Sequence, residues 1–190
     1  MGRYGLTGKI EEPITEAEFS KGMKSGHFVE DKHRAFCVLL YYAGVRRGEA
    51  LRVTRDQFRF TDSAIMYNVG ERLKHSKETP NLKLPYSAPY MMELQKTIED
   101  TKPGEKVFRF CPKTAYNIVH RVWKYPHLFR LTRITSFFQQ GYTIAQLRSW
   151  TGLSLAALEY YVGIVDTQKM GDSLAKPNRC AKTPDLDISV

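Results

Sequence analysis

The chain has 190 residues and a mass of 21.9 kDa, the size of one globular domain. Its composition, 42% hydrophobic and 26% charged, excludes disordered, collagen-like and low-complexity proteins. No apolar run approaches the roughly 18 residues that a membrane span needs, and residues 1–12 lack the apolar centre of a secretory signal.

The charge of the chain indicates the kind of partner it binds. Lysine and arginine outnumber aspartate and glutamate by 29 to 20, and the excess lies in residues 1–163. A basic globular domain attracts polyanions, so the sequence predicts a nucleic acid as partner. Cys37, Cys111 and Cys180 form no CxxC pair, which indicates a reducing, intracellular location. Neither the cysteines nor the histidines have metal-ligand spacing, so we expect no metal and no cofactor.

An extended segment followed by helices is predicted for the start of the chain. Residues 1–13 are expected to form an extended lead-in. Thr15 and Glu18 form a capping box, which predicts a short helix that ends near Lys24. The most apolar helix is predicted over residues 31–52; a glycine at position 44 interrupts it, and a second short helix is expected directly afterwards.

The next segment favours strands, because it is rich in aromatic and β-branched residues. The predicted strands are residues 57–60, 64–69 and 82–84. They are expected to form a small three-stranded antiparallel sheet with an exposed hairpin, whose turn-rich tip is residues 75–81.

The rest of the predicted domain is helical. Apolar periodicity, with caps at Thr143 and Ser154, predicts helices over residues 87–101, 112–125, 128–140, 144–150 and about 155–165. Residues 166–190 show no periodicity, and we expect a tail that is either flexible or docked on a neighbouring subunit. The predicted fold class is mainly α with one small antiparallel sheet, and the predicted domain spans residues 14–165.

Several features that carry chemistry follow one another in a fixed order. Gly44-Val45-Arg46-Arg47-Gly48-Glu49 follows the apolar helix, and Lys77 lies at the hairpin tip, eight residues before Pro85. His127-Leu128-Phe129-Arg130 opens a helix that Gly141 closes. Thr151-Gly152-Leu153-Ser154 then precedes a helix that carries Tyr160 and Tyr161. This order resembles the catalytic domain of the tyrosine recombinases, the phage-integrase family, over roughly residues 14–165.

The resemblance implies the tyrosine-recombinase fold and a site-specific DNA recombinase, or integrase, of a viral or plasmid mobile element. Such an enzyme cleaves and rejoins DNA through a 3′-phosphotyrosine without a metal. The implied catalytic residues are Arg46, Lys77, His127, Arg130 and Tyr161. The implied partner is double-stranded DNA. The implied assembly is a homo-tetramer on two DNA sites, and the protein is expected to be a monomer when it is free of DNA.

The chemistry of strand transfer independently favours these side chains. Two guanidiniums, Arg46 and Arg130, can each fork onto two phosphate oxygens and remain charged. His127 lies three residues before Arg130 and therefore shares its helix face. A lysine on a hairpin can protonate the leaving 5′ oxygen, and a tyrosine hydroxyl can form the covalent intermediate.

Some of these roles have competing candidates. Lys74 competes with Lys77 as proton donor, and Tyr160 competes with Tyr161 as nucleophile. Adjacent helical residues point about 100° apart, so only one of the two tyrosines can face the phosphate. We expect Glu49 to anchor the neighbouring arginine rather than to act as a catalyst. The predicted DNA contacts are Arg47, Lys74 and Arg133.

The sequence departs from the family pattern in two places. Leu153 stands where the family has histidine or tryptophan, and leucine cannot donate a hydrogen bond to a phosphate. Trp150 and Ser154 are the candidates to replace this donor, and the spacing from Leu153 to Tyr161 is one residue short. The family also carries a helical core-binding domain before the catalytic domain. The pattern here begins about fifteen residues from Met1, which predicts a truncated or minimal member with weakened sequence recognition.

Two other functions use the same fold and remain open at this point. DNA relaxation of the type IB topoisomerase kind uses the same catalytic residue types. A non-catalytic DNA-binding protein derived from this fold fits Leu153. An RNA-binding helical domain has no support, because the chain contains no RNP or KH motif.

Overall fold

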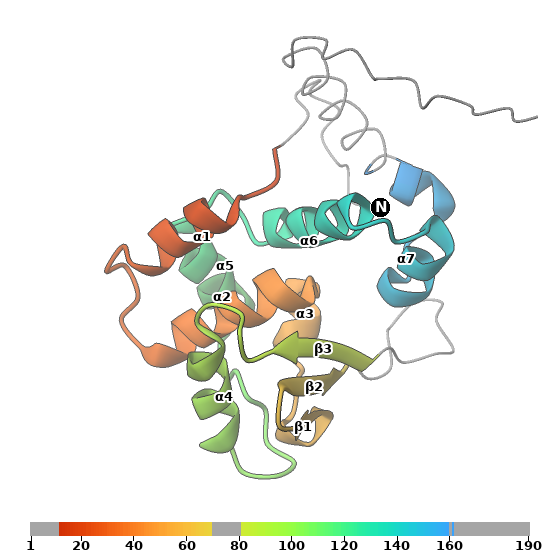
Figure 1. Cartoon of the computed structure of the whole chain (residues 1–190). Coiled ribbons are helices and arrows are strands. Elements are labelled where there is room, and N and C mark those ends of the chain that lie inside the picture. Colours follow the sequence, from red (N-terminus) through yellow and green to blue (C-terminus); the bar gives the residue numbers. More distant parts are fainter. Residues whose placement is uncertain (1–11, 70–80, 160, 162–190) are drawn as a thin grey trace, which may run out of the picture.

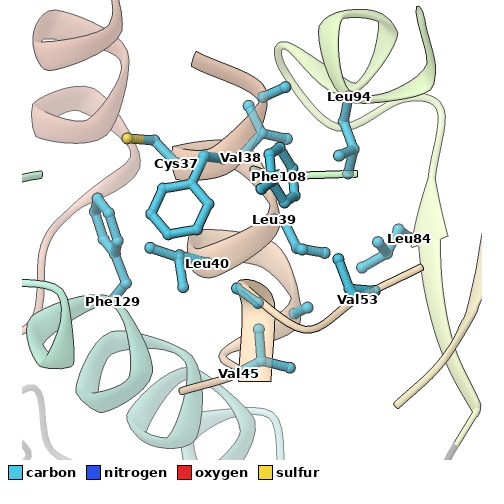
Figure 2. Packing of buried hydrophobic residues seen from close by; sticks show 14 of the residues in the cluster. Cys37, Val38, Leu39, Leu40, Val45, Val53, Leu84, Leu94, Phe108 and Phe129 are labelled. Carbon is cyan, nitrogen blue, oxygen red and sulfur yellow. The ribbon is translucent and has the colours of Figure 1, made fainter. Parts of the chain in front are cut away.

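The central element of the fold is α2 (Asp31–Ala43), the most apolar helix of the chain (Figure 1). The structure is a computed structural model that describes residues 12–69, 81–159 and 161. Seven residues of α2 are buried, so the helix is enclosed on most of its circumference. Figure 2 shows how its apolar side chains meet Phe108 from a loop and Phe129 from a neighbouring helix.

The other elements pack around this helix. They are α1 (Glu16–Met23), α3 (Arg47–Ala50), the 3-10 helix η1 (Arg55–Gln57), β1 (Phe58–Phe60), β2 (Ala64–Asn68), β3 (Asn81–Pro85), α4 (Met91–Glu99), α5 (Pro112–His120), α6 (His127–Gln139) and α7 (Ile144–Thr151). In Figure 1 the sheet and α4 lie on one side of α2, and α6 lies on the other. The predicted class, mainly helical with one small antiparallel sheet, is confirmed.

The sheet has the predicted strands in the order β1-β2-β3, and both strand pairs are antiparallel. Tyr67 of β2 lies opposite Phe58 of β1, and their rings stack with centroids 4.8 Å apart. Both side chains are buried, because this face of the sheet packs onto the main core. β3 is an edge strand, since β2 is its only strand partner in the described part of the chain.

Helix α1 is attached to the core through one aromatic side chain. The predicted capping box is present, with the Thr15 hydroxyl and the Glu18 carboxylate bonded to each other's backbone N–H groups. Phe19 is fully buried and stacks on Tyr41 at 3.9 Å and on Trp123 at 5.5 Å. This stack joins the N-terminal helix to α2 and to the segment after α5.

Two predicted helices are shorter than expected. The helix predicted over 87–101 begins only at Met91, because Tyr90 has a left-handed backbone with φ 63° that cannot continue a helix. The helix predicted over 112–125 ends at His120. The proline at position 126 disfavours helical backbone at the residue before it, and Trp123 turns into the aromatic core instead.

Other predictions fall partly or wholly outside the described residues. The lead-in and the hairpin tip lie there, as does the tail over 166–190. Of the last predicted helix, residues 155–159 are helical, and the Ser154 hydroxyl accepts a hydrogen bond from the N–H of Ala157 at 3.3 Å. In the described ranges there is no helix with the length and apolar character to cross a membrane.

The packing of α1 predicts that Gly22→Ala destabilises the protein. A Cβ at position 22 would lie 2.3 Å from Cζ2 of Trp123, so the aromatic stack would have to shift, at a cost of about 1–3 kcal/mol. Gly48 is the matched control, because its Cβ would meet nothing closer than 3.7 Å and alanine favours helix by about 1 kcal/mol. Urea denaturation should show a loss for Gly22→Ala and no loss for Gly48→Ala; equal stabilities would contradict this packing.

Candidate active site

Arg46 follows the turn that ends α2. The turn is made by Gly44, whose backbone is left-handed with φ 60° and whose N–H donates to the carbonyl of Leu40 at 3.0 Å. A side chain at this glycine would be strained, and its Cβ would lie 2.9 Å from Cβ of Arg133. Glycine therefore lets the chain leave α2 abruptly and brings Arg46 to the start of α3.

Glu49 holds the Arg46 side chain in place. Nη1 of Arg46 donates to one carboxylate oxygen of Glu49 at 2.8 Å, and the backbone N–H of Arg46 donates to the other at 2.7 Å. The Glu49 side chain is only 11% exposed, whereas that of Arg46 is 44% exposed. Burial raises the pKa of Glu49, but the hydrogen bonds from Arg46 and the charges of Arg130 and Arg46 outweigh it and hold the pKa below its ordinary value.

Arg130 is buried in the middle of the fold with 1% of its surface exposed. Its Nη1 donates to the carbonyl of Gly44 and its Nη2 to the carbonyl of Thr151, both at 2.9 Å. These carbonyls belong to the C-terminal ends of α2 and α7, where backbone acceptors have no partner within the helix and the helix dipole is negative. The two bonds fix the plane of the guanidinium.

His127 is the first residue of α6, one helical turn before Arg130. Its Nε2 lies 3.5 Å from the hydroxyl of Tyr161. Tyr161 is 6% exposed and packs in a small apolar cluster with residues of α6 and α7. The chain from α7 to Tyr161 thus returns to the N-terminal end of α6.

Arg46, His127 and Arg130 line one cavity of about 340 Å³. Tyr161 does not line it, but its hydroxyl lies beside His127, which does. The cavity has basic side chains and no carboxylate among the described residues that line it, so it suits an anion the size of a phosphate group. No three of the described His, Cys, Asp and Glu residues are grouped so that they could hold a metal ion.

The remaining predicted site residues are distributed differently. Lys74, Lys77 and Tyr160 lie outside the described residues. Arg47 lines the cavity beside Arg46, and its guanidinium lies 5.8 Å from the ring of Tyr116. Arg133 is half-buried and lines a different cavity, with its guanidinium 4.2 Å from the ring of Phe137.

Neither Leu153 nor the two candidates for the missing donor, Trp150 and Ser154, line the cavity of Arg46. Leu153 is half-buried and packs against the cluster that holds Tyr161. Trp150 lines the same cavity as Arg133, and Ser154 caps the following helical turn. Neither candidate replacement therefore reaches the cavity of Arg46 in this structure.

Two tyrosines that the sequence did not single out line the cavity. Tyr116 comes from α5, and Tyr125 directly precedes Pro126 and His127. Both are half-buried and carry a hydroxyl that can donate to a phosphate oxygen. The position of Tyr125 beside the histidine motif is the one sequence signal that could have identified it, whereas nothing local marks Tyr116.

The arrangement of elements matches known protein structures, although no protein-family model and no curated protein sequence matches the chain. The crystal structure of XerA recombinase superposes with a TM-score of 0.64 over 93% of this chain, at 16% sequence identity. The XerH site-specific recombinase bound to palindromic difH substrate, a post-cleavage complex, superposes with a TM-score of 0.61 over 91% of this chain, at 13% identity. The fold is that of the tyrosine-recombinase catalytic domain.

A third solved structure supports this assignment of the fold. The Tn1549 transposon integrase in complex with transposon right end DNA superposes with a TM-score of 0.58 over 88% of this chain, at 19% identity. The chain spans 66% of the length of the XerA structure, 55% of the XerH structure and 67% of the Tn1549 integrase structure. The matched region is thus about two thirds or less of each of these solved chains.

The buried carboxylate predicts a pH-dependent contribution to stability. Because the pKa of Glu49 is lower in the folded state, its carboxylate stabilises the fold above its unfolded pKa, and this contribution is lost as the pH falls through the folded pKa. Glu49→Gln should lower the free energy of unfolding by about 1–2 kcal/mol at pH 7. The difference from wild type should shrink steadily below the ordinary glutamate value of 4.5.

Denaturation curves for both proteins between pH 3 and 7 measure this difference directly. Glu159→Gln is the control, because Glu159 is exposed and its substitution should change stability little at any pH. A difference between Glu49→Gln and wild type that stays constant down to pH 3 would show that the carboxylate charge does not stabilise the Arg46 turn.

Proposed function

We propose that this protein is a tyrosine recombinase that cleaves and rejoins DNA strands through a 3′-phosphotyrosine, with Tyr161 as the nucleophile. The observation that carries the proposal is the cavity of Arg46, His127 and Arg130, with the Tyr161 hydroxyl 3.5 Å from His127 at its edge. The fold and the motif order support the same reaction, and the partner in the proposal is double-stranded DNA.

In the proposed reaction a DNA phosphate occupies this cavity. Arg46 and Arg130 neutralise the non-bridging oxygens, whose negative charge grows as phosphorus becomes five-coordinate. The Tyr161 oxygen forms a bond to phosphorus and passes its proton to His127, while the bond from phosphorus to the 5′ oxygen breaks. The 5′ oxygen takes a proton from a lysine, so protons balance, and attack by a free 5′ hydroxyl reverses each step.

Substrate must change the surroundings of the nucleophile. Tyr161 is nearly buried, and its hydroxyl lies beside the cavity rather than within it. We infer that bound DNA draws the helical turn of Tyr161 toward the phosphate. The contact with His127 would then shorten from 3.5 Å, as catalytic hydrogen bonds often do when the substrate complex forms.

Arg46 and Arg130 have different structural roles in this proposal. Arg130 is held by two backbone carbonyls, so its replacement also removes the tie between two helix ends. Arg46 is held by a single carboxylate and is 44% exposed, so its replacement leaves the core intact. Arg46 is therefore the better position for testing charge neutralisation without loss of the fold.

The assembly is also part of the proposal. We infer a tetramer on two DNA sites, in which the residues over 166–190 either stay flexible or dock on a neighbour. The recombinases of similar fold are longer than this chain, so its recombination partners and target site belong to the proposal as well.

A covalent adduct with DNA tests the nucleophile. Wild-type protein mixed with negatively supercoiled plasmid in the presence of a metal chelator should relax the plasmid and form a denaturant-resistant protein–DNA adduct. Tyr161→Phe should abolish the adduct, Tyr160→Phe should retain it, and Arg46→Ala should reduce its rate by about 100-fold or more. Loss of the adduct with Tyr160→Phe alone would move the nucleophile to Tyr160.

The same experiment separates recombinase chemistry from binding alone. Wild type and Tyr161→Phe could bind plasmid with equal affinity and give no adduct. The protein would then be a DNA-binding protein without this activity. Leu153 is the observation that favours this second candidate function, because it leaves the cavity without one expected phosphate donor. Relaxation without any joining of separate DNA molecules would favour the topoisomerase-like alternative.

The lysine is tested by comparing its two candidates. Lys77→Ala should slow formation of the adduct, because the 5′ oxygen then leaves without a proton, whereas Lys74→Ala should reduce only DNA affinity. Raising the protein concentration should therefore restore adduct formation for Lys74→Ala but not for Lys77→Ala. The opposite pattern would assign the proton donor to Lys74.

A further inference from the structure

A second cavity, of about 530 Å³, lies between the edge strand β3 and the helices α6 and α7. The two cavities have none of their described lining residues in common. All five residues of β3 line it, so the cavity runs along the strand. The proposed reaction makes no use of this cavity.

Three buried polar atoms from its walls have no hydrogen-bond partner among the residues that the structure describes. They are the hydroxyl of Tyr42, Nε of Arg133 and Nε1 of Trp150. Trp150 is 9% exposed, so its indole N–H has been removed from water almost completely. A buried donor without an acceptor is costly, so an occupant of the cavity that accepts hydrogen bonds from these groups would be stabilised by them.

The charged side chains described in the lining of this cavity are all positive. Arg133 lies over the ring of Phe137 at 4.2 Å, and burial lowers the pKa of its guanidinium. The exposed Lys83 is the second cation of the lining, and no aspartate or glutamate is among the described residues that line the cavity. Because Arg133 is partly removed from water and none of the described residues of this cavity is a carboxylate, an anionic occupant is favoured.

The third property is the open edge of the sheet. β2 occupies one edge of β3, and no described strand pairs with the other. An edge strand presents unpaired backbone N–H and C=O groups that can accept a further strand. The half-buried apolar side chains of Leu82 and Phe137 line the same cavity and can receive alternate side chains of that strand.

We propose that this cavity is a docking site for an extended, acidic peptide segment of a partner protein, which adds to the edge of β3. Its backbone would pair with β3, and its carboxylates would meet Arg133 and Lys83. Carboxylate and carbonyl oxygens would accept from Tyr42 and Trp150.

A peptide fits this cavity better than the DNA backbone does. A phosphate could neutralise Arg133 and Lys83 and accept hydrogen bonds from the buried donors, but it cannot pair with the backbone of an edge strand. A peptide in which acidic and apolar residues alternate satisfies the cations, the apolar walls and the strand edge together. This inference does not depend on the proposed strand-transfer activity, because no residue of the Arg46 cavity takes part in it.

Fluorescence anisotropy with the full-length chain tests the proposal. The probe is a fluorescein-labelled octapeptide of alternating glutamate and valine, compared with its glutamine counterpart. The acidic peptide should bind saturably, and the glutamine peptide should bind at least tenfold more weakly. Tyr42→Phe and Lys83→Gln should each weaken binding of the acidic peptide by about fivefold, the loss expected for one hydrogen bond or ion pair.

Matched controls distinguish docking from a structural effect. Tyr86→Phe and Lys96→Gln remove the same groups outside this cavity and should leave binding of the peptide unchanged. Tyr42→Phe also removes an unsatisfied hydroxyl, so the free energy of unfolding of the unbound protein should stay the same or rise. A structural role for this hydroxyl would instead lower the stability of the variant.

Several results would overturn the proposal. These are the absence of saturable binding, equal binding of the glutamine peptide, and unchanged binding by Tyr42→Phe and Lys83→Gln. Duplex DNA whose affinity falls in Tyr42→Phe would make the cavity a nucleic-acid site. Tighter peptide binding by Asp185→Asn and Asp187→Asn would mean that the chain's own acidic C-terminal residues occupy the cavity in place of a partner.

Discussion

The buried guanidinium of Arg130 is the interaction on which the rest of this structure depends. It joins the C-terminal ends of α2 and α7 through the carbonyls of Gly44 and Thr151, and it is itself part of α6. Carbonyls at helix ends lack partners within their own helices, and a cation placed there satisfies them and the helix dipoles together. An aliphatic side chain at this position would leave two buried acceptors unsatisfied, at roughly 1–3 kcal/mol each. The residue proposed to bind phosphate is therefore also a structural tie.

This tie works because glycine ends both helices. Gly44 and Gly152 adopt left-handed backbone with φ 60° and φ 62°, which ends α2 and α7 abruptly at the carbonyls that Arg130 binds. The turn at Gly44 also delivers Arg46, whose position Glu49 then holds. The segment over residues 44–46 thus places Arg46 directly and orients Arg130 through the carbonyl of Gly44. A side chain at Gly44 would disturb both arginines.

The same turn separates two cavities of different character. On one side Arg46, His127 and Arg130 form a small basic pocket with the Tyr161 hydroxyl at its edge. On the other side Arg133 and Trp150 pack directly against Gly44 and face the edge of β3. Arg130 and Arg133 lie three residues apart on α6, yet one binds helix ends and the other lies over an aromatic ring. Any movement at Gly44 would therefore change the positions of side chains that line both cavities.

Local chemistry was enough to predict most of the secondary structure, because capping boxes, glycine turns and apolar periodicity act over a few residues. It predicted α2, the three strands and the capping of α1 and α7, and the order of the motifs pointed to the fold that the superpositions show. It overestimated the helices around α4 and α5, where a left-handed Tyr90 and the packing of Trp123 decide the ends. The sequence by itself determined the order of the motifs, and with it which residue types are proposed to carry phosphate chemistry. Only the tertiary structure decided that Tyr116 and Tyr125 line the basic pocket, and that Trp150 and Arg133 face another cavity, because these contacts join residues far apart in the chain.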